Sequence, residues 1–306
     1  MNPTNPHGVS VVLATKDRPS LLSLAIDSVM RCLRPEDELI VVDSASEDPA
    51  TSRIARDAGA WVIRLEVPGT SRARNAGWRS AHREVVAFTD DDCQVPAEWT
   101  RIIEPVFADP SIAFVTGRLL GDRETSIASA VVVGERAMRF DESSDSASLG
   151  SGANMAFRKE ALAAIGGFDE GMGPGTPLRA AEDHDAFWRA LRAGWSGAFD
   201  PSIVVTHRIW RTRRQAIARE YSYGVGAGAL AVKLIRDGAP GAWKNLRTRL
   251  WGAGVAQATR NLIRGYESGA AATALKTIGV LEGSIRASTR PLSSRHFAAR
   301  RSPPLS

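Results

Sequence analysis

Three consecutive aspartates, Asp90, Asp91 and Asp92, follow an apolar run in the stretch VVAFTDDDCQVP (residues 85–96), which is typical of a buried strand. Like charges this close repel one another, and their free energy rises unless a cation or hydrogen-bond donors compensate them. A turn or a helix cap, the structural alternative, needs one carboxylate and not three. The spacing therefore favours a site for a cation or for a ligand with several donors.

A second acidic group, Glu182, Asp183 and Asp185, lies in the stretch AAEDHD. At the start of a helix an anion is stabilised by the helix N-terminus, so a cap is the structural explanation and a general base is the chemical one. His207, in VVTHRIWRTRR, is a lone histidine near the end of a predicted strand. Either a structural role or a ligand role fits it, and the arginines that follow suit phosphates or a solvated basic surface.

The first 120 residues alternate between two patterns that would position these side chains. Continuous apolar runs predict buried strands, and apolar residues at helical spacing predict helices between them. The alternation predicts an α/β fold with a mostly parallel sheet covered on both faces. The expected strands are 9–15, 37–44, 61–67 and 84–90, and the expected helices are 20–33, 51–60 and 71–82.

Polar residues follow the strands at the edge where parallel strands present their carboxyl ends, which is where ligands bind in such sheets. The residues expected at this edge are Thr15, Lys16, Asp17, Arg18, Asp43, Ser44 and Asp90 to Asp92. A nucleoside diphosphate bridged by a divalent cation suits an acidic edge with Arg18 and Arg74 nearby. Mg²⁺ or Mn²⁺ is favoured over zinc, because the candidate ligands are mostly oxygens and no Cys/His set is present. No glycine-rich phosphate loop follows the first strand, so the metal is expected to hold the phosphates instead.

Several stretches together resemble the family 2 glycosyltransferases of the GT-A fold, over residues 9 to about 210. The stretches VSVVLATKDRPSLL, DELIVVDSASED, SRARNAGW and FTDDDC are similar to that family's two opening strands, its Ala-Arg-Asn-x-Gly helix and its Asp-x-Asp metal motif. Downstream, GSGANMAFRKEALAAIGGFDE and AEDHDAFWRALRAGW are similar to its acceptor-side loop and its Glu-Asp helix start. Six such stretches in family-like order are highly specific.

The resemblance implies that residues 9–120 bind a nucleotide-sugar donor and that residues 121–210 form the acceptor half of a catalytic domain, 1–210. It places Thr15 and Asp43 at the base and ribose and Asp90 at the ribose, and it leaves Asp91 less securely assigned. The expected donor-binding set is Thr15, Arg18, Asp43, Arg74, Asp90 and Asp91. One departure concerns the residues after Asp43, because the family has Asp or Asn and then Gly where this chain has Ser44 and Ala45.

The resemblance also implies the reaction, with Asp92 and His207 at the metal, Asp183 as the general base and Glu182 orienting donor or acceptor. A leaving diphosphate needs a cation and an attacking hydroxyl needs a base, so the expectation is a metal-dependent inverting transfer. No Gln-x-x-Arg-Trp motif of processive synthases is present, so one sugar per acceptor is expected. Two alternatives stay open: a sugar-nucleotide nucleotidyltransferase, and a non-catalytic scaffold at a membrane surface.

Charge separates residues 207–306 from the rest, because they hold 18 Lys/Arg against four Asp/Glu. A mostly helical extension over residues 211–306 is expected, and its basic character suits an anionic membrane surface, an ordinary packed face being the alternative. No nucleic-acid partner is expected, and a homodimer is left open. With two cysteines, no secretory leader and no apolar run of about 18 residues, the expected location is cytoplasmic or peripheral at the cytoplasmic face of the membrane.

The stretch GGFDEGMGPGTPLRAAED (residues 166–183), which ends in the Glu-Asp pair, is rich in Gly and Pro and has no periodicity. Such a segment is either a connector or a lid over the site. A lid is favoured, because closure would exclude water from a reaction with which hydrolysis competes.

Overall fold

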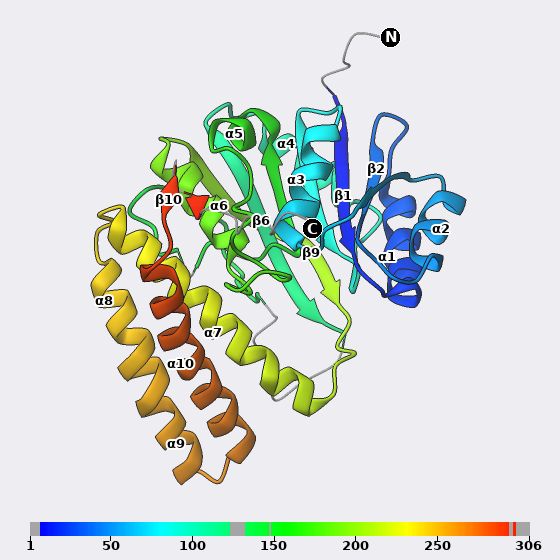
Figure 1. The fold of residues 1–306 in the computed structure, drawn as a ribbon. Coiled ribbons are helices and arrows are strands. Elements are labelled where there is room, and N and C mark those ends of the chain that lie inside the picture. Colours follow the sequence, from blue (N-terminus) through cyan, green and yellow to red (C-terminus); the bar gives the residue numbers. More distant parts are fainter. Residues whose placement is uncertain (1–6, 123–131, 147, 294–295, 298–306) are drawn as a thin grey trace, which may run out of the picture. The chain divides into compact units, whose positions relative to one another are not determined.

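The computed structural model describes residues 7–122, 132–146, 148–293 and 296–297. Figure 1 shows the chain coloured along its sequence. The described residues divide into two compact units. The first holds the residues up to 168 together with 183–209, and the second holds 169–182 and the residues from 210 onward.

The first unit is built on a mixed sheet, which has nine strands within the described residues. The strand order is β3-β2-β1-β4-β8-β6-β9-β5, with β7 paired to β9. The strands β1 to β4 run parallel, whereas β8 lies antiparallel between β4 and β6. The bounds are β1(Val9–Thr15), β2(Glu38–Ser44), β3(Trp61–Leu65), β4(Val85–Asp90), β5(Cys93–Gln94), β6(Ile112–Gly121), β7(Met138–Phe140), β8(Asn154–Arg158) and β9(Ser196–His207).

Helices cover both faces of this sheet, which explains why its strands are continuous apolar runs. In β1, Val11 and Leu13 belong to one buried core, and Val12 between them belongs to the other. Side chains alternate between the faces of a strand, so a strand buried on both faces is apolar throughout. Helices α1(Pro19–Cys32), α2(Ala50–Asp57) and α4(Trp99–Val106) line the first core, and α3(Thr70–Ser80), α5(Lys159–Ala164) and α6(Glu182–Arg192) line the second.

The elements predicted for the first ninety residues are confirmed, with ends that differ by at most three residues. The antiparallel position of β8 was not predicted, because the apolar pattern of a buried strand is the same whether it runs parallel or antiparallel to its neighbours. The stretch that contains β8 was quoted only for its family likeness. Its pairing with β4 brings Asn154 opposite Thr89, next to the aspartates that end β4.

The second unit is mostly helical, and its helices lie within residues 211–306, where a helical extension was predicted. Its elements are α7(Arg213–Arg236), α8(Ala242–Arg247), the π-helical η1(Thr248–Ala256), α9(Gln257–Ile263), α10(Glu267–Ser288), and the short strands β10(Leu292–Ser293) and β11(His296–Phe297). Helix α7 begins at a capping box, in which Thr212 and Gln215 each bond the other's backbone N–H. None of the helices in the described residues is long and apolar enough to span a membrane.

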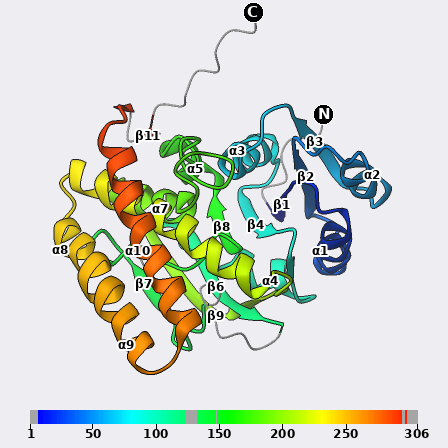
Figure 2. The ribbon, with the colours of Figure 1, turned by 60° about the horizontal axis from the view of Figure 1, so that its bottom comes forward.

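Helices α7 and α10 approach each other closely at glycines spaced four residues apart, and Figure 2 shows the two helices crossing. A Cβ at Gly228 would lie 2.1 Å from the carbonyl oxygen of Val280, and one at Gly283 would lie 2.0 Å from that of Val225. Gly224 and Gly279 meet backbone of the opposite helix in the same way. The crossing therefore depends on residues without side chains.

Residues 166–183 are the stretch for which a lid was expected, and the part of it that belongs to the second unit, 169–182, is anchored there by a buried ion pair. Asp169 Oδ2 accepts hydrogen bonds from Lys233 Nζ at 2.6 Å and from the backbone N–H of Phe297 at 2.8 Å. Met172 and Leu178 of the same segment are fully buried. A lid movement stays a prediction, but the part of the segment held by these contacts is not a loose connector.

The glycine crossing can be tested by Gly228→Ala, with Gly252→Ala in η1 as the control. Because the Cβ introduced at position 228 would overlap backbone, we expect a loss of about 1–3 kcal/mol in the free energy of unfolding, the usual cost of overpacking. A Cβ at Gly252 meets nothing nearer than 3.7 Å, so the control should be neutral or slightly stabilising. Urea denaturation measures both; equal stabilities would contradict the close crossing.

Candidate active site

The three aspartates at the end of β4 have different surroundings in the structure. The side chain of Asp91 is 1% exposed, accepts a hydrogen bond from Thr15 Oγ1 at 2.7 Å, and lies 3.0 Å from Arg18 Nη1. Burial raises the pKa of Asp91 to about 7; Arg18 opposes this shift and Asp92 adds to it. Asp91 thus ties the end of β1 to the end of β4, and its buried carboxylate is directed at Thr15 and Arg18 rather than at the surface.

Asp92 and His207 come together because β5 pairs with β9. The register places Cys93 opposite His207, and the backbone N–H of Arg208 donates to the carbonyl oxygen of Asp92 at 2.8 Å. As a result, Asp92 Oδ1 lies 3.5 Å from His207 Nε2. These two residues are 115 positions apart in the sequence, and the predicted metal pair is therefore brought together by the fold.

The Asp92 and His207 pair fits a divalent cation that also binds a diphosphate. Ligand atoms at right angles around Mg²⁺ lie about 3 Å apart, given bonds of about 2.1 Å, so the observed separation needs little adjustment. Within the described residues no group of three or more His, Cys, Asp or Glu side chains forms a metal cage. Of the two side chains, the carboxylate suits Mg²⁺ or Mn²⁺, and the imidazole suits a transition metal.

Arg74 links the aspartates to the second acidic group. Its Nη2 lies 3.2 Å from Asp90 Oδ1 and donates to the carbonyl oxygen of Gly152 at 3.3 Å. The N–H of Gly152 in turn donates to Asp183 Oδ2 at 2.7 Å. A Cβ at Gly152 would lie 2.9 Å from that oxygen and 3.0 Å from the Arg74 guanidinium, so only glycine fits between them without displacement.

The pKa of Asp183 lies below its ordinary value. Burial acts to raise it, but the charges of His184 and Arg74 and the N–H groups of His184 and Gly152 outweigh that effect. Asp183 is also the second residue of α6, where the helix N-terminus favours an anion. It is therefore a carboxylate at neutral pH, in the protonation state that a general base requires.

The other acidic residues of this group differ from Asp183. Asp185 is fully buried, and its Oδ2 accepts from Arg189 Nε at 2.9 Å. Arg189 also donates to the carbonyl oxygens of Ile165 and Gly167, so the pair fixes a loop rather than facing a substrate. Glu182, predicted to orient donor or acceptor, is buried at the first turn of α6.

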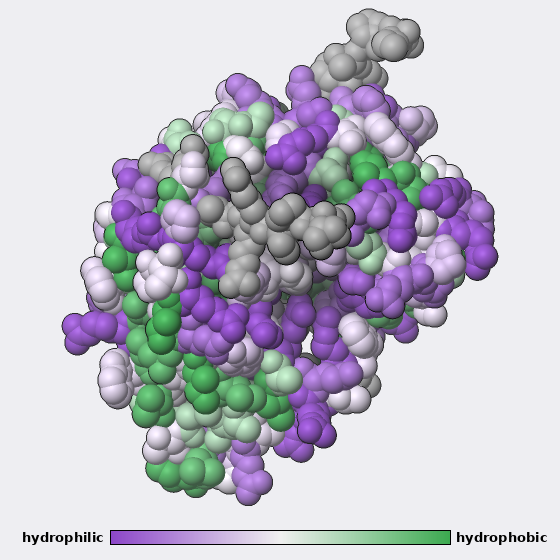
Figure 3. Space-filling view, viewed as in Figure 1, coloured by the Kyte–Doolittle hydropathy of each residue, from purple (hydrophilic) through white to green (hydrophobic). Residues whose placement is uncertain are grey.

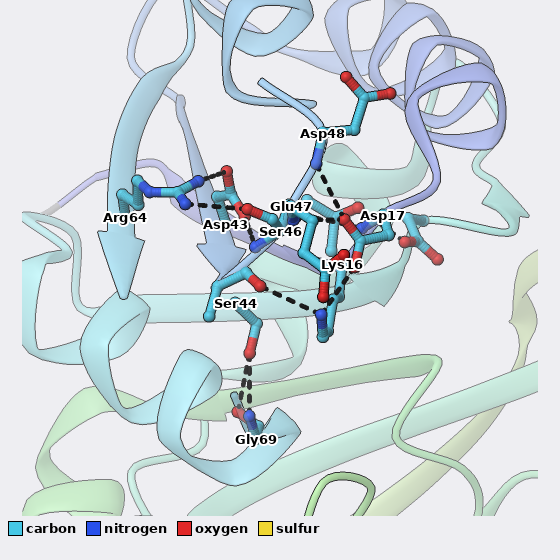
Figure 4. Close-up of polar contacts among 12 residues, drawn as sticks. Lys16, Asp17, Asp43, Ser44, Ser46, Glu47, Asp48, Arg64 and Gly69 are labelled. Carbon is cyan, nitrogen blue, oxygen red and sulfur yellow. Dashed lines mark hydrogen bonds and ion pairs between the residues drawn. The ribbon is translucent and has the colours of Figure 1, made fainter. Parts of the chain in front are cut away.

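The loops after β1 and β2 are bonded to each other, as Figure 4 shows. Asp17 Oδ1 accepts from the N–H of Glu47 at 2.6 Å, and the N–H of Asp17 donates to Ser46 Oγ at 2.9 Å. Lys16 Nζ donates to the carbonyl oxygen of Ala45 at 3.1 Å. Ala45 stands where the family has glycine, and its φ of 59° is in the left-handed region that glycine adopts without cost.

Two residues near the site were not singled out in the sequence. Gly152 lies in the quoted stretch GSGANM, but glycine carries no functional group that would mark it. Arg64, on β3, pairs with Asp43 at 3.0 Å across the sheet. The sequence held a partial signal for Arg64, which is a charged residue within an otherwise apolar predicted strand, but the register that places it beside Asp43 comes only from the fold.

The fold described above is the GT-A fold, as the comparisons with solved structures show. The glycosyl transferase family 2 model matches residues 10–166, about half of the chain. This chain belongs to that family.

Among curated proteins, the "Pre-mycofactocin glycosyltransferase" of Mycobacterium tuberculosis is 30% identical over 248 residues, which cover 76% of this chain and 50% of that protein. The chain thus corresponds to about half the length of this relative. "Glycosyltransferase AglE" of Haloferax volcanii is 23% identical over 233 residues, which cover 71% of this chain and 72% of that protein.

Two solved structures share the fold. The mannosyltransferase PcManGT from Pyrobaculum calidifontis has a TM-score of 0.64 at 20% identity, over 92% of this chain and 87% of that one. Its structure is a complex with GDP-Man and Mn²⁺. S. aureus TarS has a TM-score of 0.56 at 18% identity, over 75% of this chain and 40% of that one. The predicted GT-A fold is confirmed, and the family match favours a glycosyltransferase over the nucleotidyltransferase alternative.

The strained loop can be tested by Ala45→Gly. Relief of a left-handed alanine is worth about 1–2 kcal/mol, from which the greater freedom of glycine in the unfolded chain subtracts about 0.4–1 kcal/mol. We therefore expect a net gain of roughly 0.5–1 kcal/mol in the free energy of unfolding, measured in urea. The control is Ala50→Gly in the first turn of α2, which should be destabilising; a loss at both positions would contradict the strain.

Proposed function

We propose that this chain transfers one sugar from a nucleotide-sugar donor to an acceptor hydroxyl with inversion at the anomeric carbon, using Mg²⁺ or Mn²⁺. The observation that carries the proposal is the arrangement around Arg74, which touches Asp90 beside the metal pair and Gly152 beside the ionised Asp183. Arg74, Asp92, Gly152, Asp183 and His207 all belong to the first unit, which supports placing the cation and the base in one site. The GDP-Man and Mn²⁺ bound by the Pyrobaculum relative support this reading.

Asp92 and His207 would hold the cation, which when bound neutralises the charge that develops on the leaving diphosphate. Asp183 takes the proton of the acceptor hydroxyl through Oδ1 or Oδ2. The hydroxyl oxygen forms the new bond to the anomeric carbon as the bond to the diphosphate oxygen breaks, and the diphosphate keeps the electron pair. One displacement with one base forms no covalent sugar–enzyme intermediate, so the anomeric configuration inverts.

Arg74 and Gly152 position the base. The guanidinium keeps Asp183 ionised through its charge, and the N–H of Gly152 orients one carboxylate oxygen. The pKa of Asp183 is below that of a free Asp, about 4, so protonation of this base should not limit activity in the neutral range. The carboxylate is thus prepared before any acceptor arrives, which reduces the reorganisation needed in the transition state.

Incubation with Mn²⁺ and UDP-, GDP- and dTDP-sugars, with release of nucleoside diphosphate as the readout, tests the proposed activity. Some release from one donor in Mn²⁺, and its loss in EDTA, are expected. Undiminished release in EDTA would overturn the metal-dependent mechanism. No release from any donor, together with no binding of any nucleoside diphosphate, would leave the scaffold alternative.

Asp183→Asn tests the base. We expect turnover with acceptor to fall about 10²- to 10⁴-fold, because the hydroxyl loses its proton acceptor, while the affinity for the nucleoside diphosphate stays within a few-fold. Asp27→Asn, at an exposed position of α1, is the control and should behave as wild type. Normal turnover of Asp183→Asn would place the base elsewhere, and the buried pairing of Asp185 makes that residue an unsuitable replacement.

We propose that the second unit attaches peripherally to an anionic membrane surface. Residues 238–266 contain five Lys/Arg and no Asp or Glu. Large apolar side chains are exposed on the helices of this stretch and on α10, which also carries Glu267 and Glu282. Figure 3 shows hydrophobic residues gathering over the lower helices α9 and α10. These exposed side chains include Trp243 at 66%, Trp251 at 68%, Leu262 at 63%, Ile263 at 80% and Ile285 at 67%.

Apolar side chains surrounded by lysine and arginine match the interface of an anionic bilayer, where each basic residue contributes about 1 kcal/mol. Co-sedimentation with vesicles of phosphatidylcholine, with and without phosphatidylglycerol, tests the attachment. Binding to the anionic vesicles should weaken with salt and with Lys244→Glu/Arg247→Glu, whereas Arg53→Glu on α2 should have no effect. Absence of binding to anionic vesicles at low salt would return these helices to a packing role.

A further inference from the structure

Arg64 covers Asp43 at the carboxyl edge of the sheet, and Figure 4 shows its guanidinium facing that carboxylate. Its Nη1 donates to Asp43 Oδ2 at 3.0 Å, and its Nη2 donates to the carbonyl oxygen of Ser46 at 2.8 Å. The side chain of Arg64 is 43% exposed, whereas that of Asp43 is 0% exposed. A ligand that approaches this position therefore meets Arg64 and not Asp43.

The carboxylate of Asp43 is already engaged by protein groups. Oδ1 accepts from the N–H of Ser46 at 2.9 Å, and Oδ2 accepts from the hydroxyl of Ser52 in addition to Arg64. Burial acts to raise the pKa of Asp43, but the bonds from Ser46 and Ser52 and the charge of Arg64 outweigh it and keep the group ionised. Asp43 is thus a fixed anion that orients the guanidinium.

The place of Arg64 in the sheet is that of the predicted nucleotide site. Thr15 of β1 lies in register with Asp43 of β2, and Asp43 lies in register with Arg64 of β3. The three residues form one row at the carboxyl ends of parallel strands, next to β4 and its aspartates. The carbonyl of Ser46, which holds Arg64, belongs to the loop that is bonded to Asp17, so the guanidinium rests on a rigid support.

We propose that Arg64 recognises the base of the donor nucleotide, with Asp43 as its positioning residue, and that it selects bases with a carbonyl oxygen at C4 of a pyrimidine or C6 of a purine. This inference rests on the proposed function. A guanidinium has five N–H donors and no acceptor, and two of its nitrogens here already use one donor each on protein oxygens. The remaining donors suit O4 of uracil or thymine, or O6 and N7 of guanine, and they cannot pair with the amino group of cytosine or adenine.

Matched pairs of nucleoside diphosphates provide the test, because each pair differs only in replacing a carbonyl oxygen and the adjacent ring N–H by an amino group and an unprotonated ring nitrogen. UDP is compared with CDP, and inosine diphosphate with ADP, by calorimetric titration of the full chain in Mn²⁺. For the base that the site accepts, the carbonyl partner should bind about ten- to a hundredfold more tightly. The pyrimidine and purine arms distinguish a uracil-type from a guanine-type donor.

Arg64→Met keeps the aliphatic stem and removes the donors, so the preference within the accepted pair should fall to about twofold or less. Arg64→Lys, which keeps the charge but not the planar fork, should retain part of it. Asp43→Asn removes the anion that orients the guanidinium and should weaken the preference, whereas Arg56→Met, at an exposed position of α2, should not change it. Circular dichroism and thermal melting establish that each variant is folded.

The outcomes separate the two proposals. Equal binding within both pairs, or an Arg64→Met variant that keeps the wild-type preference, would overturn the role of Arg64 while the glycosyltransferase proposal stands. If the wild-type chain binds none of UDP, CDP, inosine diphosphate, ADP, GDP and dTDP in Mn²⁺, the proposed function is overturned and this inference with it.

Discussion

The site depends on the compensation of negative charge at the carboxyl edge of the sheet. Three aspartates lie at the end of β4: Arg74 contacts Asp90, and Arg18 lies against both Asp91 and Asp92. Burial raises the pKa of Asp91 to about 7, whereas Asp183, which Arg74 also faces, stays ionised. In the proposed reaction a divalent cation at Asp92 and His207 would add positive charge to this acidic edge and would hold the diphosphate there.

The same constraint explains why the surrounding backbone is so restricted. Arg74 can serve both Asp90 and Asp183 only because Gly152 has no side chain between them. On the other side of the sheet, Asp43 is held by Ser46, Ser52 and Arg64, and the loop that carries Ser46 is fixed by Asp17. Buried carboxylates must be fully bonded to stay charged, and the bonds that satisfy them also make the site rigid.

The two units rely on different physical principles. In the first, apolar strands buried on both faces provide a stable sheet, and polar side chains gather where the strands end. In the second, helices α7 and α10 touch through glycines, and large apolar side chains are left on the surface among basic ones. That distribution is unusual for a helical unit surrounded only by water, since such helices normally direct their large apolar residues inward.

The sequence by itself determined the order of elements in the first ninety residues, the mostly parallel sheet, the family and the residues of the acidic groups. Those features follow from local patterns: apolar runs, helical spacing, and short motifs in a fixed order. The tertiary structure decided which of those residues meet. Asp92 reaches His207 only through the β5–β9 pairing, Asp183 reaches Arg74 only through Gly152, and Asp43 is covered by Arg64 only because two strands share a register. Each of these contacts joins positions far apart in the chain, and no periodicity in a sequence records a register between strands or the space beside a glycine.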